Sequence, residues 1–183
     1  MANRWVNLLF DVLRSATRPS RRGTPSSPRG PRPTSGPRPA TAPGGYPGDF
    51  TGAVRPVYSP DLDGSPDPGE VVWTWVPYEE DQKNANNPRG KDRPVLLIGR
   101  DGPWLLGLQL TSKDHDRDAA QEARYGRLWM DIGTGAWDSQ GRPSEVRINR
   151  IIRVDPVKVR REGAVLDRKT FDAVVAAMHK AGH

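Results

Sequence analysis

Arg93, Thr111 and Ser112 are the residues whose types and positions best suit phosphate chemistry. Arg93 stands before Pro94 in the segment GKDRPVLLIG, and Thr111 and Ser112 end the apolar run of LQLTSK. An arginine held at the start of a rigid strand suits a phosphate because its planar fork can bind two oxygens at once. Hydroxyl groups at the end of another strand can hydrogen-bond the same group. The pattern therefore favours binding of a phosphodiester.

Carboxylates that precede Arg93 would complete a site for cutting RNA. RNA carries its own nucleophile, the 2′-hydroxyl, so cleavage requires a proton acceptor, charge stabilisation at phosphorus and help for the leaving oxygen. Glu79, Glu80 and Asp81 lie in the polar stretch before Arg93 and are candidates for the acceptor. A structural role stays open, since Arg93 could instead pair with a nearby carboxylate such as Asp92.

Other chemistries lack the residues that they require. The sequence contains no cysteine, no glycine-rich nucleotide-phosphate loop and no Gly-x-Ser-x-Gly nucleophile motif. His115 is the single histidine ahead of the last expected helix, which is too few for a paired-histidine ribonuclease mechanism. The acidic residues around it match no metal-ligand spacing, so we expect no metal site; they are Asp114, Asp116 and Asp118.

Five strand-like runs and one helix would position these residues. The runs are rich in β-branched and aromatic residues or alternate apolar with polar side chains, and they cover residues 70–77, 93–99, 104–112, 125–133 and 145–154. Arg100-Asp101-Gly102 predicts a hairpin turn, and residues 78–92 a long loop. Asp167 is a good N-cap for a final helix that Gly182 ends. We therefore expect a mainly β domain with a C-terminal helix (α+β), folded as a small, partly closed barrel.

The first 68 residues differ in composition from the rest. Thirteen of the 19 prolines precede Gly69, and residues 19–68 include almost no aliphatic side chains. Such a segment cannot bury enough apolar area to offset the entropy of ordering it. We therefore expect residues 1–68 to form a disordered arm and residues 69–183 to form one domain. If the arm only tunes affinity or localisation, its removal leaves the cleavage chemistry intact.

The arm itself has two features that suggest binding. Six arginines and no acidic residue lie from Arg18 to Gly45, and the chain has a net charge of +6. Such a basic segment would bind phosphate polymers or acidic surfaces, but a solvated tail with no partner fits equally well. Residues 3–17 fit a short amphipathic helix, which would dock on a partner or a membrane surface, or only fray. No apolar run approaches the ~20 residues of a membrane span and no signal peptide is expected, so we predict a cytoplasmic protein.

Taken in order, the segments resemble the MazF/PemK family of toxin–antitoxin ribonucleases. The resemblance covers about residues 69–180, with GEVVW, GKDRPVLLIG, LQLTSK, VRINRIIRVD and VLDRKTFDAVVAAM as the matching segments. It implies a small SH3-like barrel of the MazF/PemK/CcdB type with a C-terminal helix, which forms a homodimer. It also implies cleavage of single-stranded RNA without a metal or other cofactor, leaving a 2′,3′-cyclic phosphate.

The resemblance also assigns candidate site residues. Arg93 matches the family's catalytic arginine before proline, and Thr111 matches its threonine, with Ser112 beside it. The first loop is longer than is typical, so Glu80 and Asp81 both stay candidates for the acid–base role. The residues expected to contact RNA are Gln82, Lys91, Lys113, His115 and Trp137. Trp137, like Trp129, would stack on unpaired bases, unless the two rings fill the core or a dimer contact.

The sequence thus predicts a sequence-selective, metal-independent endoribonuclease toxin that cleaves single-stranded RNA, inhibits growth and is neutralised by an antitoxin. The antitoxin would lay a disordered segment over the RNA-binding groove. One alternative is a non-catalytic RNA- or protein-binding SH3-like module, and another is a CcdB-like toxin that acts on a protein target. Arg93 and Thr111 favour the enzyme, because a toxin with a protein target needs no phosphate site.

Overall fold

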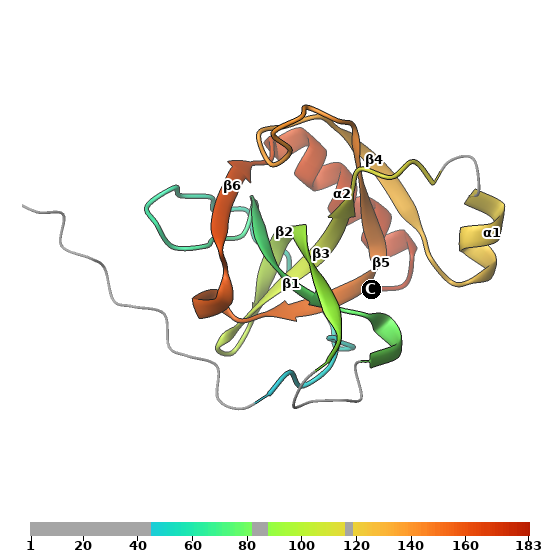
Figure 1. Cartoon of the computed structure of the whole chain (residues 1–183), viewed down its shortest axis with the longest axis horizontal. Coiled ribbons are helices and arrows are strands. Elements are labelled where there is room, and N and C mark those ends of the chain that lie inside the picture. The colour runs from blue at the N-terminus through green and yellow to red at the C-terminus, as the bar shows by residue number, and fades with distance from the viewer. Residues whose placement is uncertain (1–44, 82–87, 116–118) are drawn as a thin grey trace, which may run out of the picture. The chain divides into compact units, whose positions relative to one another are not determined.

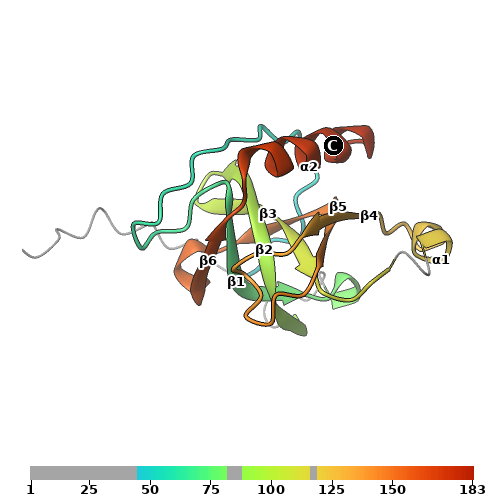
Figure 2. The ribbon, with the colours of Figure 1, turned by 90° about the horizontal axis from the view of Figure 1, so that it is seen from above.

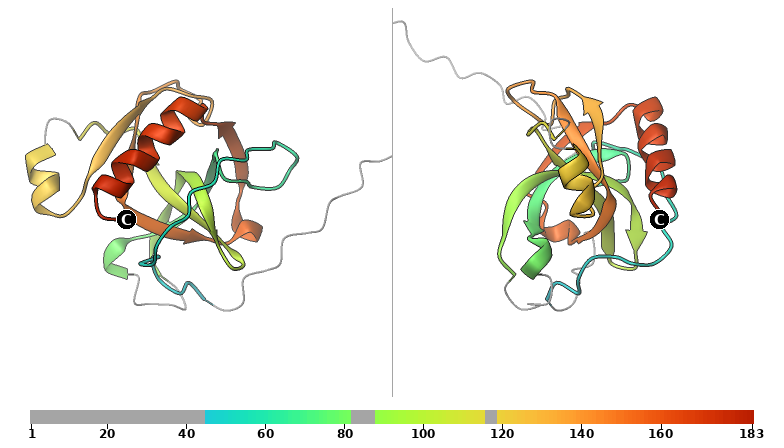
Figure 3. Two further views of the ribbon diagram at one scale, coloured as in Figure 1. Left: turned by 180° about the vertical axis from the view of Figure 1, so that it is seen from behind. Right: turned by 90° about the vertical axis from the view of Figure 1, so that its right-hand side faces the viewer.

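The computed structural model describes residues 45–81, 88–115 and 119–183, which form mainly one antiparallel sheet with a helix packed on it (Figure 1). The strands are β1 (Glu70–Pro77), β2 (Gly90–Asp101), β3 (Trp104–Thr111), β4 (Trp129–Gly133), β5 (Ser144–Val154) and β6 (Arg161–Val165). They follow the order β4-β5-β3-β2-β1-β6 across the sheet. The strands curl round rather than lie flat (Figure 3), which confirms the expected mainly β fold with a C-terminal helix.

The sheet buries apolar side chains on both faces. Along β2, Leu96 and Ile98 belong to the core beneath helix α2 (Arg168–Lys180), whereas Val95 and Leu97 belong to a second core on the opposite face. This explains why the run PVLLIG is apolar without interruption, since a strand alternates with polar residues only where one face meets water. Figure 2 shows α2 lying across one face of the sheet.

Helix α2 begins and ends where the sequence predicts. The Asp167 carboxylate accepts a hydrogen bond from the backbone N–H of Thr170 at 3.0 Å, which is the expected N-cap contact. The helix buries Phe171, Val174 and Met178 against the sheet. Its first turn therefore has a capped N–H group and its apolar face is covered.

Residues 45–68 lie against the domain, although the sequence predicts them as part of a disordered arm. Val54 is buried in the core beneath α2, and Phe50 forms a β-bridge to β5. The Tyr58 hydroxyl donates a hydrogen bond to the carbonyl of Leu166 at 2.8 Å. A few apolar side chains are sufficient to hold this segment against the domain, because each of them packs on a hydrophobic surface that the sheet and helix already provide.

Other parts of the sequence prediction fall outside the residues that the structure describes. They are the first 44 residues, with the helix expected at 3–17, Gln82 in the first loop, and Asp116 and Asp118 after β3. Within the described part of the chain, no helix is long and apolar enough to span a membrane.

Four short elements are absent from the sequence prediction. They are the 3-10 turns η1 (Glu79–Asp81) and η3 (Pro156–Lys158), helix α1 (Ala119–Arg124) and strand β6. Helix α1 lies beyond β4, on the other side of the domain from β6 (Figure 1). Strand β6 pairs with β1 and forms one edge of the sheet, and η1 follows β1 in the chain.

Candidate functional site

Two neighbouring hollows meet at Arg93, Thr111 and Lys113, which line both of them. The first, called here the His115 pocket, has a volume of about 320 Å³ and lies between the end of β1, η1 and strands β3 to β5. The second, called the Trp73 pocket, has a volume of about 420 Å³. The three shared residues therefore stand at the junction of the two pockets.

Strands β2 and β3 bring Arg93 and Thr111 to this junction. Val95 pairs with Gln109 in the antiparallel register, and continuing that register by two residues places Arg93 opposite Thr111. Pro94 lies just beyond the last β2–β3 pair, where a residue without an N–H group is tolerated. The structure thus places the selected arginine and threonine side by side on two adjacent strands, with Thr111 as the last residue of β3 and Arg93 three residues after the start of β2.

Five basic side chains line the His115 pocket, and three of them are paired with carboxylates. The pairs are Arg147 with Glu79 at 2.9 Å, Arg150 with Asp49 at 2.6 Å, and Arg127 with Glu122 at 3.6 Å. The side chains of Arg93 and Lys113 have no hydrogen bond or ion pair with any other residue that the structure describes. These two cations are therefore available to bind an anion such as a phosphate.

A register shift in β5 explains why Arg147 and Arg150 both reach this pocket. Residues 147–150 face the single residue Gln109 of β3. Residues three apart in a regular strand point to opposite faces, whereas an irregularity of this kind re-aims side chains. Neither arginine is among the site residues that the sequence predicts, yet both form the wall of this pocket, with side chains 4% and 5% exposed.

The carboxylates of the first loop differ in their fitness for proton transfer. Glu80 lines the His115 pocket, but Asp81 does not. Asp81 forms a forked pair with Arg89, and the hydrogen bonds from Arg89 hold the pKa of the Asp81 carboxyl below its ordinary value. Glu79 lines the pocket, but hydrogen bonds from Arg147 lower its pKa in the same direction. A lowered pKa weakens a proton acceptor, so Glu80 is the best placed of the three.

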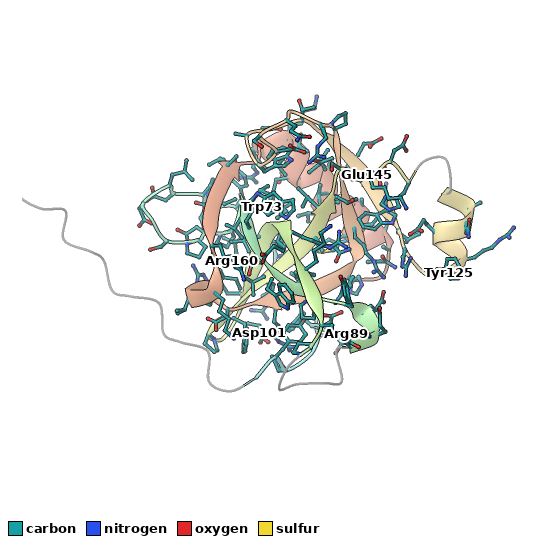
Figure 4. The ribbon with its side chains drawn as sticks, in the orientation of Figure 1. Trp73, Arg89, Asp101, Tyr125, Glu145 and Arg160 are labelled. Carbon is teal, nitrogen blue, oxygen red and sulfur yellow. The ribbon has the colours of Figure 1, made fainter. Side chains whose placement is uncertain are left out.

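His115 forms part of the pocket wall and has a fixed orientation. Its Nδ1 lies 2.8 Å from a carboxylate oxygen of Glu145, and its backbone N–H donates to the other oxygen at 2.8 Å. Figure 4 labels Glu145. The His115 ring stacks on Trp129, with centroids 4.3 Å apart and planes inclined by 1°. The Trp129 indole in turn donates to Glu122 at 3.1 Å. These contacts hold an imidazole in the wall of the pocket.

Trp137 does not lie where the sequence prediction requires it. Its side chain is 3% exposed in the core beneath α2, and its indole nitrogen donates to the Ser144 hydroxyl at 3.1 Å. A buried ring cannot stack on an RNA base, so that prediction is corrected: Trp137 is a core residue. Lys91 and Ser112 are exposed and line the Trp73 pocket.

The acidic cluster that follows β3 is described only in part. Its histidine, His115, binds Glu145 of β5. Among the residues that the structure describes, no three His, Cys, Asp or Glu side chains are grouped closely enough to hold a metal ion.

Comparison with known proteins places the chain in a family. Similar solved structures include MazE–MazF (Form II) from Deinococcus radiodurans, at 17% identity and a TM-score of 0.41, covering 63% of this chain and 94% of that chain. They also include the Mycobacterium tuberculosis toxin MazF-mt6, at 15% identity and a TM-score of 0.37, covering 60% of this chain and 94% of that chain. No curated protein matches the sequence. A family model for PemK-like, MazF-like toxins matches residues 67–181, which is more than half of the chain. The chain therefore belongs to the PemK-like, MazF-like toxins of type II toxin–antitoxin systems, as its motifs predict.

Proposed function

We propose that this protein is an endoribonuclease toxin that cuts single-stranded RNA at the junction of the His115 and Trp73 pockets. Toxins of this family are generally endoribonucleases. Arg93 and Thr111 carry the proposal, because they lie on two adjacent strands and line both pockets. A phosphate bound between them leaves space for one nucleotide on each side, in hollows of a size usual for small-molecule sites.

Arg93 and Thr111 would act on the charge that develops during cleavage. As the 2′-oxygen attacks phosphorus, negative charge grows on the phosphoryl oxygens, and two parallel N–H groups of a guanidinium can stabilise it. Arginine stays protonated, so Arg93 is a charge stabiliser and not a proton donor. The products are a 2′,3′-cyclic phosphate and a 5′-hydroxyl. Because the chain supplies its own cations at this point, we propose that cleavage is independent of metal.

The two pockets also favour single-stranded RNA as the substrate. Unpaired bases can turn out of a stack and enter a pocket, where side chains reach their edges. Gln109 and Glu80 line the His115 pocket and offer hydrogen-bonding groups of this kind, which we propose as a source of sequence selectivity. Lys91 and Lys113 are exposed beside the junction and would contact neighbouring phosphates.

We further propose that an antitoxin controls the enzyme. The Deinococcus radiodurans structure contains MazE together with MazF. For the present chain we propose a corresponding antitoxin, with a segment that folds on binding and covers the two pockets. We propose in addition a homodimer, and action in the cytoplasm, where messenger RNA is available.

The test is cleavage of a long single-stranded RNA in the presence of EDTA. Removing one charge-stabilising donor typically lowers kcat by about 10²–10³-fold, so Arg93→Ala and Thr111→Ala are each expected to lose at least that much. Arg168→Ala is the matched control, because Arg168 is an exposed arginine on α2 paired with Asp172. Full activity of Arg93→Ala would contradict the proposed site.

The same experiment separates the alternatives. Growth inhibition by the wild-type protein without any RNA cleavage would favour a CcdB-like action on a protein target. RNA binding without cleavage and without growth inhibition would favour a non-catalytic module. Loss of wild-type cleavage on adding EDTA would mean that a metal takes part.

A further inference from the structure

We propose that His115 is the proton acceptor of the cleavage reaction and that Glu145 is its positioning residue. The inference rests on the proposed endoribonuclease function and adds to it the group that takes the proton from the 2′-hydroxyl. His115 lies in the wall of the pocket that Arg93 and Thr111 also line, and its ring contacts Glu145.

Glu145 determines which nitrogen of the ring is available. An ionised carboxylate can only accept hydrogen bonds, so the short contact between Nδ1 and Glu145 requires the hydrogen to lie on Nδ1. In the neutral ring Nε2 then carries the lone pair, which is the tautomer that a proton acceptor needs. Glu145 is itself held, because its second oxygen accepts the backbone N–H of His115 and its side chain is 7% exposed.

Trp129 fixes the plane of the ring. The indole and the imidazole are parallel and in contact, and the indole is held by its hydrogen bond to Glu122. The imidazole is therefore restrained in its plane by Trp129 and along its edge by Glu145. A proton acceptor that is already oriented loses little entropy when the substrate binds.

The carboxylates of the first loop compete poorly for this role. Glu79 and Asp81 are both bound to arginines that lower their pKa values. Glu80 lines the same pocket and is the remaining competitor, so the test must compare it with His115. Glu145 of β5 contacts the imidazole, and Glu122 of α1, Arg127 before β4 and Lys113 after β3 line the same pocket.

The proposed step is balanced with water as the only co-reactant. The 2′-oxygen bonds to phosphorus while its proton passes to Nε2 of neutral His115, which becomes an imidazolium. The bond between phosphorus and the 5′-oxygen breaks, its electron pair stays on that oxygen, and a water molecule supplies the proton of the new 5′-hydroxyl. The imidazolium then gives its proton to the hydroxide that the water leaves, which restores the neutral ring.

The experiment measures kcat and KM on an RNA that contains one cut site, after wild-type cleavage and its loss in Arg93→Ala have been established. A positioned acid–base group contributes about 10²–10⁴-fold to the rate, so His115→Ala is expected to lower kcat by that factor with little change in KM. Added imidazole should enter the space left beside Trp129 and restore much of the rate to His115→Ala. Thermal unfolding of each variant shows whether the fold survives.

Three further variants separate proton transfer from structure. His115→Asn keeps an N–H group for Glu145 but cannot accept a proton, so it is expected to stay inactive with or without imidazole. Glu145→Gln keeps one acceptor oxygen, enough for Nδ1–H but not also for the backbone N–H of His115, so it should lose part of the activity but far less than Glu145→Ala. His179→Asn is the matched control on the exposed side of α2 and should be as active as the wild type.

Several results would overturn the inference. One such result is that His115→Ala has a kcat within a few-fold of the wild-type value. Another is that Glu80→Gln loses cleavage activity while His115→Asn retains it. An RNA with sulfur in place of the 5′-oxygen at the cut site needs no proton on its leaving group. If that RNA restores the rate of His115→Ala, then His115 donates a proton to the leaving oxygen and does not accept one. A wild-type protein that cuts no RNA would overturn the proposed function itself, and this inference with it.

Discussion

Asp49 connects the segment before β1 to the centre of the sheet. Its carboxylate receives two hydrogen bonds from Arg150, at 2.6 and 3.2 Å, and another from the Tyr46 hydroxyl. The Arg150 side chain is 5% exposed and that of Asp49 13%. In Asp49→Ala the buried guanidinium keeps neutral acceptors, the carbonyl of Pro77 at 2.8 Å and the side-chain oxygen of Gln109 at 3.3 Å, but loses its counterion.

The structure allows the expected loss of stability to be worked out. Removing one partner of a buried ion pair costs about 3–5 kcal/mol, because the other charge stays out of water without compensation. The neutral acceptors that remain beside Arg150 place Asp49→Ala at the lower end, at about 3 kcal/mol. For a domain of this size each kcal/mol lowers Tm by about 3 °C, so we expect a fall of about 9 °C.

Thermal unfolding followed by circular dichroism measures this loss. Asp61→Ala is the matched control, because Asp61 is an exposed aspartate in the same segment, where substitutions change stability by only about 0.5 kcal/mol. Asp49→Asn should fall between the two, since its amide oxygen still accepts a hydrogen bond from Arg150. If Asp49→Ala melts with the wild type, residues 45–68 do not unfold together with the sheet and the reasoning is refuted.

Three other predictions follow from the packing and the charges. Removing residues 1–68 should unfold or severely destabilise the domain, because Phe50, Val54 and Asp49 are lost. A Tm equal to that of the full chain would contradict this. Trp137→Ala should lower the free energy of unfolding, measured with denaturant, by about 3–5 kcal/mol, since a buried ring is replaced by a cavity. Loss of RNA binding at unchanged stability would instead support the predicted stacking role of this ring. Hydrogen bonds from Arg147 lower the pKa of Glu79, so this ion pair stabilises the fold at pH values above the ordinary carboxyl pKa of about 4.3, and the stabilisation is lost as the pH falls through the lowered pKa. The difference in Tm between the wild type and Glu79→Gln should therefore be present at pH 7 and shrink towards pH 3. A difference in Tm that stays constant with pH would argue against the pair.

The sequence predicted the elements whose local signals agree with the tertiary structure. The first strand was expected at residues 70–77 and β1 occupies those residues, because its apolar and aromatic side chains fit a sheet buried on both faces. The hairpin at Gly102 and the N-cap of α2 at Asp167 depend on short-range geometry, which a sequence shows directly. Arg93 and Thr111 could be selected because they flank apolar runs that had to be strands, although β2 itself begins earlier, at Gly90.

The remaining features depend on contacts between distant residues. Phe50, Val54 and Tyr58 are spaced four apart within a proline-rich segment, and their low density concealed that each one packs on the domain. The shift in the pairing of β5 lets the side chains of Arg147 and Arg150 both point into the same pocket, which strict alternation along a strand does not predict. Trp137 could be assigned to the core only once the loop after β4 was known to fold back over the sheet.

Sequencing of RNA ends tests the central claim most directly. A long single-stranded RNA is incubated with the wild-type protein or with Arg93→Ala, in EDTA, and the new 5′ and 3′ ends are mapped. We predict that the wild type produces ends at a recurring short sequence, with 2′,3′-cyclic phosphates and 5′-hydroxyls, and that Arg93→Ala produces none above background. New ends of the same kind and frequency from both proteins, or no new ends from the wild type, would contradict an RNA-cleaving site at Arg93 and Thr111.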